Sequence, residues 1–188
     1  MKKLNLTPLD SFLYTQDDLD NFDCGNKDIN TFFSNGCIEQ SESYKSKTMV
    51  LNDNKSIIGF YTLAIGNLEI KDLENQNIIF RPYINIAYFA IQKEYQKKGI
   101  GKRMMDEVFK TALVVAYYVG VELIYLESVD ESVEFYESCH FELINPRLRP
   151  EAYNCDTSKL GFPMYIAVKK IIELEYTGYY KNYTNNDL

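Results

Sequence analysis

Apolar and polar positions along this chain predict a central unit of strand, helix and strand. The apolar, aromatic-rich segment from Tyr83 to Ile91 predicts a strand, and apolar residues spaced by three and four from Ile100 onward predict an amphipathic helix. That helix is expected to end near Gly120, and Val121 to Leu126 predicts a short buried strand. Two strands joined through a helix in this way predict a right-handed parallel crossover.

The chain before this unit predicts a strand, a helix and a hairpin. Asn26 suits the cap of the helix, which carries Ile29, Phe32, Phe33 and Cys37 on one face. The polar stretch Glu69 to Asn77 is expected to be a connection or a short helix. The strands are expected at Leu4 to Leu9, Lys47 to Leu51 and Ser56 to Ile65, the last two joined by the turn Asn52 to Lys55.

The chain after the crossover predicts a closing part of alternating helix and strand. A helix is expected at Glu131 to Ser138, a strand start at Phe141 to Ile144, a long loop at Pro146 to Gly161 and a final strand at Phe162 to Ile172. The predicted fold class is α/β (α+β): a mixed central sheet with antiparallel amino-terminal strands, one parallel crossover and helices on both faces. We expect one domain at residues 1–172. A tyrosine- and asparagine-rich tail at 173–188 is loosely packed, or packs on a partner subunit or the substrate cleft.

The composition of the chain limits its expected cellular location and its expected binding partners. No apolar run approaches the roughly 20 residues that span a bilayer, and Met1 to Leu4 leads into polar residues, so we expect a cytoplasmic protein with no membrane partner. The four cysteines lack the spacing of a zinc site, which predicts free thiols and no metal. The net charge of −7 opposes a polyanionic partner unless basic residues cluster locally.

The turn between the predicted central strand and helix has the chemistry of a phosphate cradle. Glycines let the backbone approach a ligand, and the first amides of a helix point outward with the positive end of the helix dipole. A nucleoside triphosphate loop is excluded because Gln96 replaces its first glycine and Arg103 follows Lys102. A dinucleotide fingerprint is excluded because Met104 replaces its third glycine.

The stretch Gln96-Lys97-Lys98-Gly99-Ile100-Gly101 resembles the Gln/Arg-x-x-Gly-x-Gly/Ala motif of the GCN5-related N-acetyltransferases (GNAT). Ile57 to Ala64 looks like the third strand of that family, and Phe135 to Phe141 resembles its late Phe/Leu-Tyr-Glu-x-x-Gly-Phe signature. Phe22 to Phe33 resembles the subgroup that includes toxin acetyltransferases encoded beside ribbon-helix-helix antitoxins. The resemblance implies the GNAT fold and acetyl transfer from acetyl-coenzyme A to a primary amine.

The resemblance also implies roles for particular residues. The pyrophosphate of acetyl-coenzyme A would meet the backbone amides of the turn, and its pantetheine arm would lie along the preceding strand. Tyr136 corresponds to the family tyrosine that protonates the coenzyme A thiolate. Transfer from a phenol of pKa about 10 to a thiol of pKa about 8.5 is uphill by roughly 2 kcal/mol in water, which a site can offset. The implied donor-binding residues are Phe89, Ile91, Gln96, Lys97, Lys98, Gly99, Ile100, Gly101 and Lys102.

The base that would take the proton of the acceptor amine is open. The predicted strand at Tyr83 to Ile91 contains no carboxylate, which leaves Glu127 and Glu69 as candidates. Loss of the proton to water, or an amine of pKa near 8, would need no strong base. The only histidine, His140, replaces a family glycine. We expect a left-handed turn there rather than a base.

The acceptor has several alternatives. The first is an enzyme that acetylates a primary amine of unknown kind. If that enzyme is a toxin, the amine is the amino group of aminoacyl-tRNA, and an antitoxin is its partner. The second is not an enzyme but a non-catalytic module that binds coenzyme A or a protein, and a homodimer is compatible with either. Binding of tRNA would require one basic face made from Arg81, Arg147, Arg149, Lys159, Lys169 and Lys170.

Overall fold

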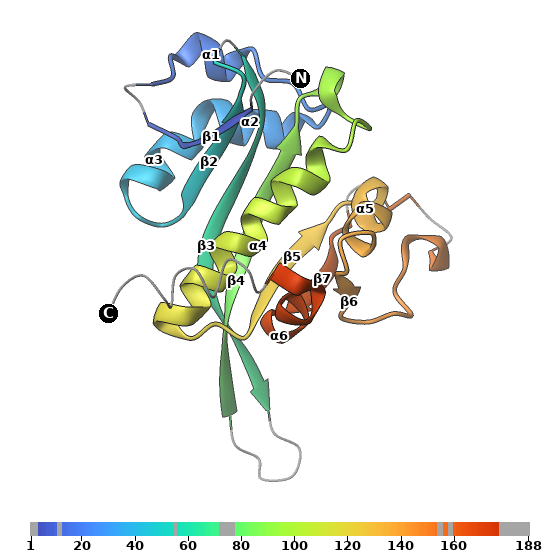
Figure 1. The fold of residues 1–188 in the computed structure, drawn as a ribbon. Helices are drawn as coiled ribbons and strands as arrows, with labels where there is room; N and C mark the ends of the chain where they lie inside the picture. The colour runs from blue at the N-terminus through green and yellow to red at the C-terminus, as the bar shows by residue number, and fades with distance from the viewer. Residues whose placement is uncertain are drawn as a thin grey trace. The chain divides into compact units, whose positions relative to one another are not determined.

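The computed structural model describes residues 4–10, 13–54, 56–71, 78–153, 156–157 and 160–176. Its strands form one mixed sheet in the order β1-β2-β3-β4-β5-β7-β6, in which β4 and β5 pair in parallel (Figure 1). This sheet confirms the predicted fold class. The strands are β1 (Asn5–Pro8), β2 (Lys47–Asn52), β3 (Ile57–Lys71), β4 (Ile78–Ile91), β5 (Leu123–Ser128), β6 (Glu142–Leu143) and β7 (Phe162–Ala167).

The helices differ greatly in length. The longest, α4, starts directly after the glycine turn and ends before Gly120, whose φ of 69° is the left-handed conformation of a helix C-terminus. None of the helices in the described part of the chain has the length and apolar character needed to cross a membrane. The helices are α1 (Gln16–Asp20), α2 (Lys27–Asn35), α3 (Cys37–Glu42), α4 (Ile100–Val119), α5 (Val133–Glu137) and α6 (Val168–Ile171).

The chain forms two compact units, and β3, β4 and α4 contribute to both. The first unit comprises residues 1–64 and 86–105 and has an aromatic core. Phe33 of α2 stacks on Phe60 of β3 with ring centroids 4.1 Å apart, and Phe22 lies 4.9 Å from Phe33. Burial of these large side chains holds α2 against the antiparallel strands β2 and β3.

The second unit comprises residues 65–85 and 106–188. Tyr83 pairs with Leu123 and Ile84 with Ile124 in parallel, which confirms that the predicted crossover is parallel. Alternate residues of β5 are buried, and they pair across to buried residues of the antiparallel strand β7. Phe109 of α4 packs against Phe141 with ring centroids 6.0 Å apart, so the helix covers apolar side chains of this unit.

The strands β3 and β4 extend beyond their predicted limits. β3 continues past Ile65 to Lys71, so Glu69 lies in a strand and the predicted connection or short helix is wrong for residues 69–71; residues 72–77 lie outside the described part. β4 begins at Ile78 rather than Tyr83. The extension of β4 exposes Ile78, Ile79 and Phe80, so burial does not define where that strand begins.

The predicted final strand also ends early. It stops at Ala167, and Val168 begins α6 because Val168 and Ile171, three residues apart, are both buried on one helical face. Residues 172–176 form a π-helical turn, and the predicted tail beyond 176 lies outside the described residues.

The predicted helix after Asn26 is two helices. Gly36 separates α2 from α3, and it ends the first of them. The sequence interpretation missed α1, although Thr15 and Asp18 form a reciprocal capping box at its start.

Candidate active site

The glycine turn of the first unit presents backbone N–H groups toward solvent. A short 3-10 helix at Lys93–Tyr95 leads into it, and α4 begins at Ile100. Lys97 and Gly99 have φ angles of 57° and 76°, both in the left-handed region. The earliest i to i−4 bond of α4 runs from Arg103 N to Gly99 O at 3.4 Å, so the three N–H groups before Arg103 have no i−4 partner within the helix.

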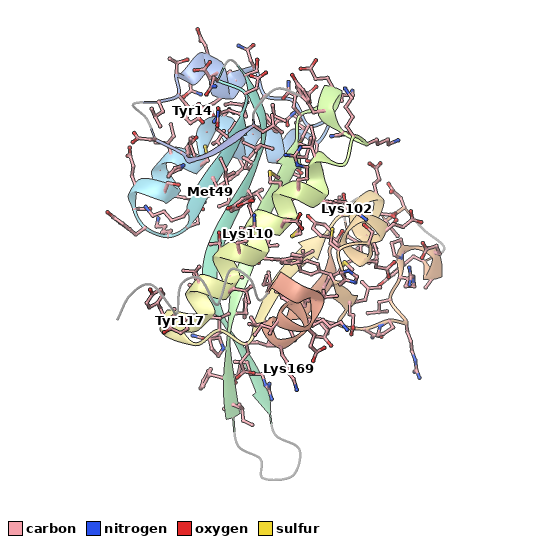
Figure 2. The ribbon with its side chains drawn as sticks, viewed as in Figure 1. Tyr14, Met49, Lys102, Lys110, Tyr117 and Lys169 are labelled. Carbon is pink, nitrogen blue, oxygen red and sulfur yellow. The ribbon has the colours of Figure 1, made fainter. Side chains whose placement is uncertain are left out.

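Positive side chains surround these amides. Lys97, Lys98, Lys102 and Arg103 are all exposed, and Figure 2 shows Lys102 on the first turn of α4. The ammonium of Lys98 lies 5.5 Å from the ring centroid of Tyr95. Free amides, the positive end of a 20-residue helix and nearby cations together suit a phosphate group.

The side chain of Gln96 fixes the turn to the rest of the first unit. Its Nε2 donates to the carbonyl of Cys24 at 2.8 Å and to the carbonyl of Ile91 at 2.9 Å. Both side-chain amide hydrogens are therefore used on the backbone, and Gln96 N itself donates to the carbonyl of Lys93 at 3.3 Å, so Gln96 holds the turn rather than offering a donor to a ligand. Of the other predicted donor-binding residues, Ile91 is buried and Phe89 is half-buried at the end of β4.

Close packing keeps the end of β4 in place. A Cβ on Gly59 of β3 would lie 2.7 Å from the carbonyl oxygen of Ala90 and 2.7 Å from Cδ1 of Ile91. Glycine is needed here because the two strands and their side chains leave no room for a methyl group. Gly59 belongs to the stretch Ile57 to Ala64 that resembles the third strand of the GNAT family. At this residue the backbones of β3 and β4 approach each other closely.

In the second unit, Tyr136 lies on α5 with 8% of its surface exposed. Its ring meets the ring of Phe141 edge-on, with centroids 5.8 Å apart. Burial raises the pKa of the Tyr136 phenol, with a smaller contribution from Cys139. The hydroxyl therefore stays protonated at neutral pH and can donate a hydrogen bond to a developing thiolate.

His140 adopts the predicted left-handed turn. Its φ is 69°, its backbone N–H donates to the carbonyl of Glu137 at 2.9 Å, and its side chain is exposed. The next residue, Phe141, donates its N–H to the carbonyl of Tyr136 at 3.0 Å. His140 thus completes the turn that follows α5 and returns the chain to the buried Phe141.

The two candidate bases are in different settings. Glu127 is exposed at the end of β5 and accepts a hydrogen bond from the Tyr125 hydroxyl at 3.0 Å. The pKa of Tyr125 rises to about 12, first because of burial and then because of this carboxylate. A Cβ on Gly161 would lie 2.9 Å from Glu127 Oε2, so a glycine leaves room for the carboxylate. Glu69 is exposed on β3.

Three of the four cysteines lie in the described residues. Cys37 and Cys139 are buried and Cys24 is half-buried. Cys155 lies outside the described residues.

The sequence model of the acetyltransferase (GNAT) domain family matches residues 44–143, more than half of the 188 residues. The chain belongs to the GNAT acetyltransferases. The glycine turn and α4 lie inside the matched range, and so does Tyr136. The chain is therefore an acetyltransferase with acetyl-coenzyme A as its acetyl donor, as the sequence resemblance implied.

Solved structures share the fold of this GNAT enzyme over nearly its whole length. A bacterial toxin matches with a TM-score of 0.75 at 19% identity, covering 94% of this chain and 97% of the other. AtaTR bound with acetyl-coenzyme A matches with a TM-score of 0.73 at 21% identity, covering 93% and 99%. AtaT complexed with acetyl-methionyl-tRNAfMet matches with a TM-score of 0.71 at 18% identity, covering 92% and 99%.

Sequence reasoning missed three residues that support the glycine turn. They are Asp23, Asn30 and Gln92. The side chain of Asn30 donates to the Asp23 carboxylate and accepts from Cys24 N, and the side chain of Gln92 accepts from Asp23 N. One local signal was available: Asp23 and Gly25 have the spacing of an Asx-turn, and the Asp23 carboxylate does accept the Gly25 N–H at 2.8 Å. Nothing local indicated Gln92, because its partner is 69 residues away.

Proposed function

We propose that this GNAT enzyme transfers the acetyl group of acetyl-coenzyme A to the α-amino group of an aminoacyl-tRNA. The observation that carries the proposal is the shared fold with AtaT complexed with acetyl-methionyl-tRNAfMet, which extends over 92% of this chain. Other neighbours are toxins bound to antitoxin, among them AtaT with the C-terminus of AtaR. An antitoxin is accordingly the protein partner that we propose here.

The donor would be held by the glycine turn. Gln96 N already donates to the carbonyl of Lys93, so the amides of Lys97 to Gly101 would receive the pyrophosphate, and Lys97, Lys98 and Lys102 would add positive charge. The left-handed geometry at Lys97 and Gly99 and the outward N–H groups of the first helical turn support this assignment. Phe89 and Ile91, at the end of β4, would lie beside the pantetheine arm.

Tyr136 would act as the acid for the departing thiolate. Burial disfavours its phenolate, so the neutral hydroxyl is the form present throughout the physiological pH range. The raised pKa makes complete proton transfer to the sulfur less favourable than in water. Stabilisation by a donated hydrogen bond is therefore the contribution that we assign to Tyr136.

An acceptor amine of low basicity suits the rest of the site. The strand β4 contains no carboxylate over its full length from Ile78 to Ile91. The α-amine of an amino-acid ester has a pKa of about 8, so an appreciable fraction is neutral at physiological pH without a strong base. A lysine side chain, with a pKa of about 10.4, would depend far more on a base such as Glu127.

Charge decides how tRNA could approach. Arg81 pairs with Glu122 at 2.6 Å and Arg149 with Glu137 at 2.8 Å, so two of the expected cations already have carboxylate partners. All four side chains are substantially exposed, and exposed ion pairs contribute at most about 1 kcal/mol. Phosphates can replace these carboxylates at small cost. Such binding would weaken as salt concentration rises.

The test is acetyl transfer to charged tRNA. The enzyme is incubated with radiolabelled acetyl-coenzyme A and a set of aminoacyl-tRNAs, with uncharged tRNA and small primary amines as parallel acceptors. The proposal predicts label on at least one aminoacyl-tRNA and none on uncharged tRNA. Label on small amines only, at saturating enzyme, would refute the tRNA acceptor and leave acetyl transfer in place.

A further inference from the structure

The segment between α1 and α2 is held in one shape by a hydrogen-bond network of its own. The Asp23 carboxylate accepts from Gly25 N and from Asn30 Nδ2, each at 2.8 Å, while Asn30 Oδ1 accepts from Cys24 N at 3.0 Å. These bonds lower the pKa of Asp23, the bond from Gly25 most strongly. Gly25 has a φ of 90°, a conformation that glycine adopts readily.

Three further hydrogen bonds join this segment to the glycine turn. Asp23 N donates to Gln92 Oε1 at 2.9 Å, and Lys93 N donates to Asp23 O at 2.8 Å. Gln96 Nε2 donates to Cys24 O at 2.8 Å. The partners are about 70 residues apart in the chain, and the three bonds attach to successive points of the stretch that leads into α4.

We propose that Asp23, Asn30 and Gln92 are positioning residues that hold the glycine turn in the shape that binds the pyrophosphate of acetyl-coenzyme A. The inference rests on the proposed role of that turn in donor binding. Lys97 keeps a left-handed backbone that a non-glycine residue adopts at a cost, and neighbouring contacts must hold it there. A turn that is already in its binding shape loses less conformational entropy when the donor binds.

The segment between α1 and α2 is stabilised by apolar packing rather than by the hydrogen bonds that join it to the glycine turn. Phe22 is buried and packs on Phe33 and Phe60, with centroid distances of 4.9 and 5.3 Å, so apolar contacts anchor the segment in the core. Asp23 is fully exposed and Gln92 is half-buried. Removing the Gln92 side-chain bond should therefore disturb the turn with little effect on folding.

The experiment measures the affinity for coenzyme A by isothermal titration calorimetry, which needs no acceptor. Gln92→Leu removes the oxygen that accepts from Asp23 N, and Gln92→Glu keeps an acceptor at that place. We expect Gln92→Leu to raise the Kd for coenzyme A about fivefold or more, the value of roughly one hydrogen bond, and Gln92→Glu to restore it to within about twofold. The KM for acetyl-coenzyme A should rise with the Kd, while kcat at saturation stays within about twofold.

Gln16→Leu is the matched control. Gln16 Nε2 donates to Ser34 O at 2.9 Å and to Asp20 Oδ1 at 2.8 Å, so this variant removes comparable surface hydrogen bonds that have no connection to the turn. It should leave the Kd for coenzyme A unchanged. Asn30→Asp is a second variant, because it sets a carboxylate against that of Asp23, and it should weaken coenzyme A binding in the same way.

Two outcomes would overturn the inference. One is a wild-type Kd in both Gln92→Leu and Asn30→Asp, and the other is a fall in kcat with the Kd unchanged. A wild-type enzyme that binds coenzyme A but acetylates no aminoacyl-tRNA would refute the proposed acceptor alone. A wild-type enzyme that binds no coenzyme A would refute both the donor site and the positioning role.

Discussion

The phenol of Tyr136 is buried on α5, and burial raises its pKa above the usual value of about 10. Tyr136→Phe removes the hydroxyl and keeps the ring against Phe141. We expect kcat to fall about 100-fold with the KM for acetyl-coenzyme A nearly unchanged. Because the raised pKa keeps the phenol protonated as pH rises, wild-type kcat should show no loss from this group below about pH 10.

Steady-state kinetics from pH 6 to 10 check this prediction, with Tyr118→Phe as the control because Tyr118 is an exposed tyrosine of α4. An unaltered kcat in Tyr136→Phe would remove the residue from the mechanism. An alkaline loss below pH 10 that disappears in the mutant would show that burial does not protect the phenol.

Single residues differ in how well the sequence predicts their roles. The left-handed turn at His140 was predictable because backbone preference is local to a residue type. The side-chain hydrogen bonds of Gln96 and Gln92 were not predictable, because a glutamine amide can bond to a ligand or to the protein backbone. Their backbone partners, Cys24 O and Asp23 N, are about 70 residues away in the chain. The roles assigned to Tyr136 and to the turn in donor binding remain predictions.

Among the elements, β3 and β4 depend on close approach at Gly59. Gly59→Ala would bring a methyl carbon to 2.7 Å from the Ala90 carbonyl oxygen and force β4 to shift. Overpacking of this kind is expected to lower the free energy of unfolding by about 1–3 kcal/mol. Because β4 leads into the glycine turn, coenzyme A binding should weaken as well.

Urea unfolding measures the first effect, and Gly99→Ala separates steric from conformational causes. A Cβ on Gly99 would meet no atom within 4 Å, but its φ of 76° is unfavourable for alanine, so a smaller loss of about 1 kcal/mol is expected. Equal stability of Gly59→Ala and the wild type would mean that the two strands tolerate the extra methyl group.

Element boundaries were predictable only where burial marks them. The hydrophobic pattern identified β2, β4, α4, β5 and β7, whose inward side chains are buried. It missed the outer parts of β3 and β4. In the outer part of β4, Ile78 and Phe80 are exposed, and the two strands are held by backbone pairing. It also continued β7 into α6, because Val168, Ile171 and Ile172 are apolar and the sequence there has no residue that marks a strand end.

For the whole molecule, net charge was predictable from the sequence and its distribution was not. The chain carries a formal charge of −7, yet Lys97, Lys98, Lys102 and Arg103 gather on one exposed turn. Arg81 and Arg149 are held by carboxylates in pairs that no sequence spacing indicated. A polyanion such as the proposed tRNA acceptor would therefore have to bind through local cations against a repulsive total charge.

The most direct test of the central claim follows both products of one reaction. With a single aminoacyl-tRNA and acetyl-coenzyme A, free thiol is measured alongside the acetylated aminoacyl-tRNA, which mass spectrometry identifies after hydrolysis as the N-acetyl amino acid. The account predicts equal amounts of the two products for wild type and a joint fall of about 100-fold in Tyr136→Phe. Thiol release without any N-acetyl amino acid would contradict it.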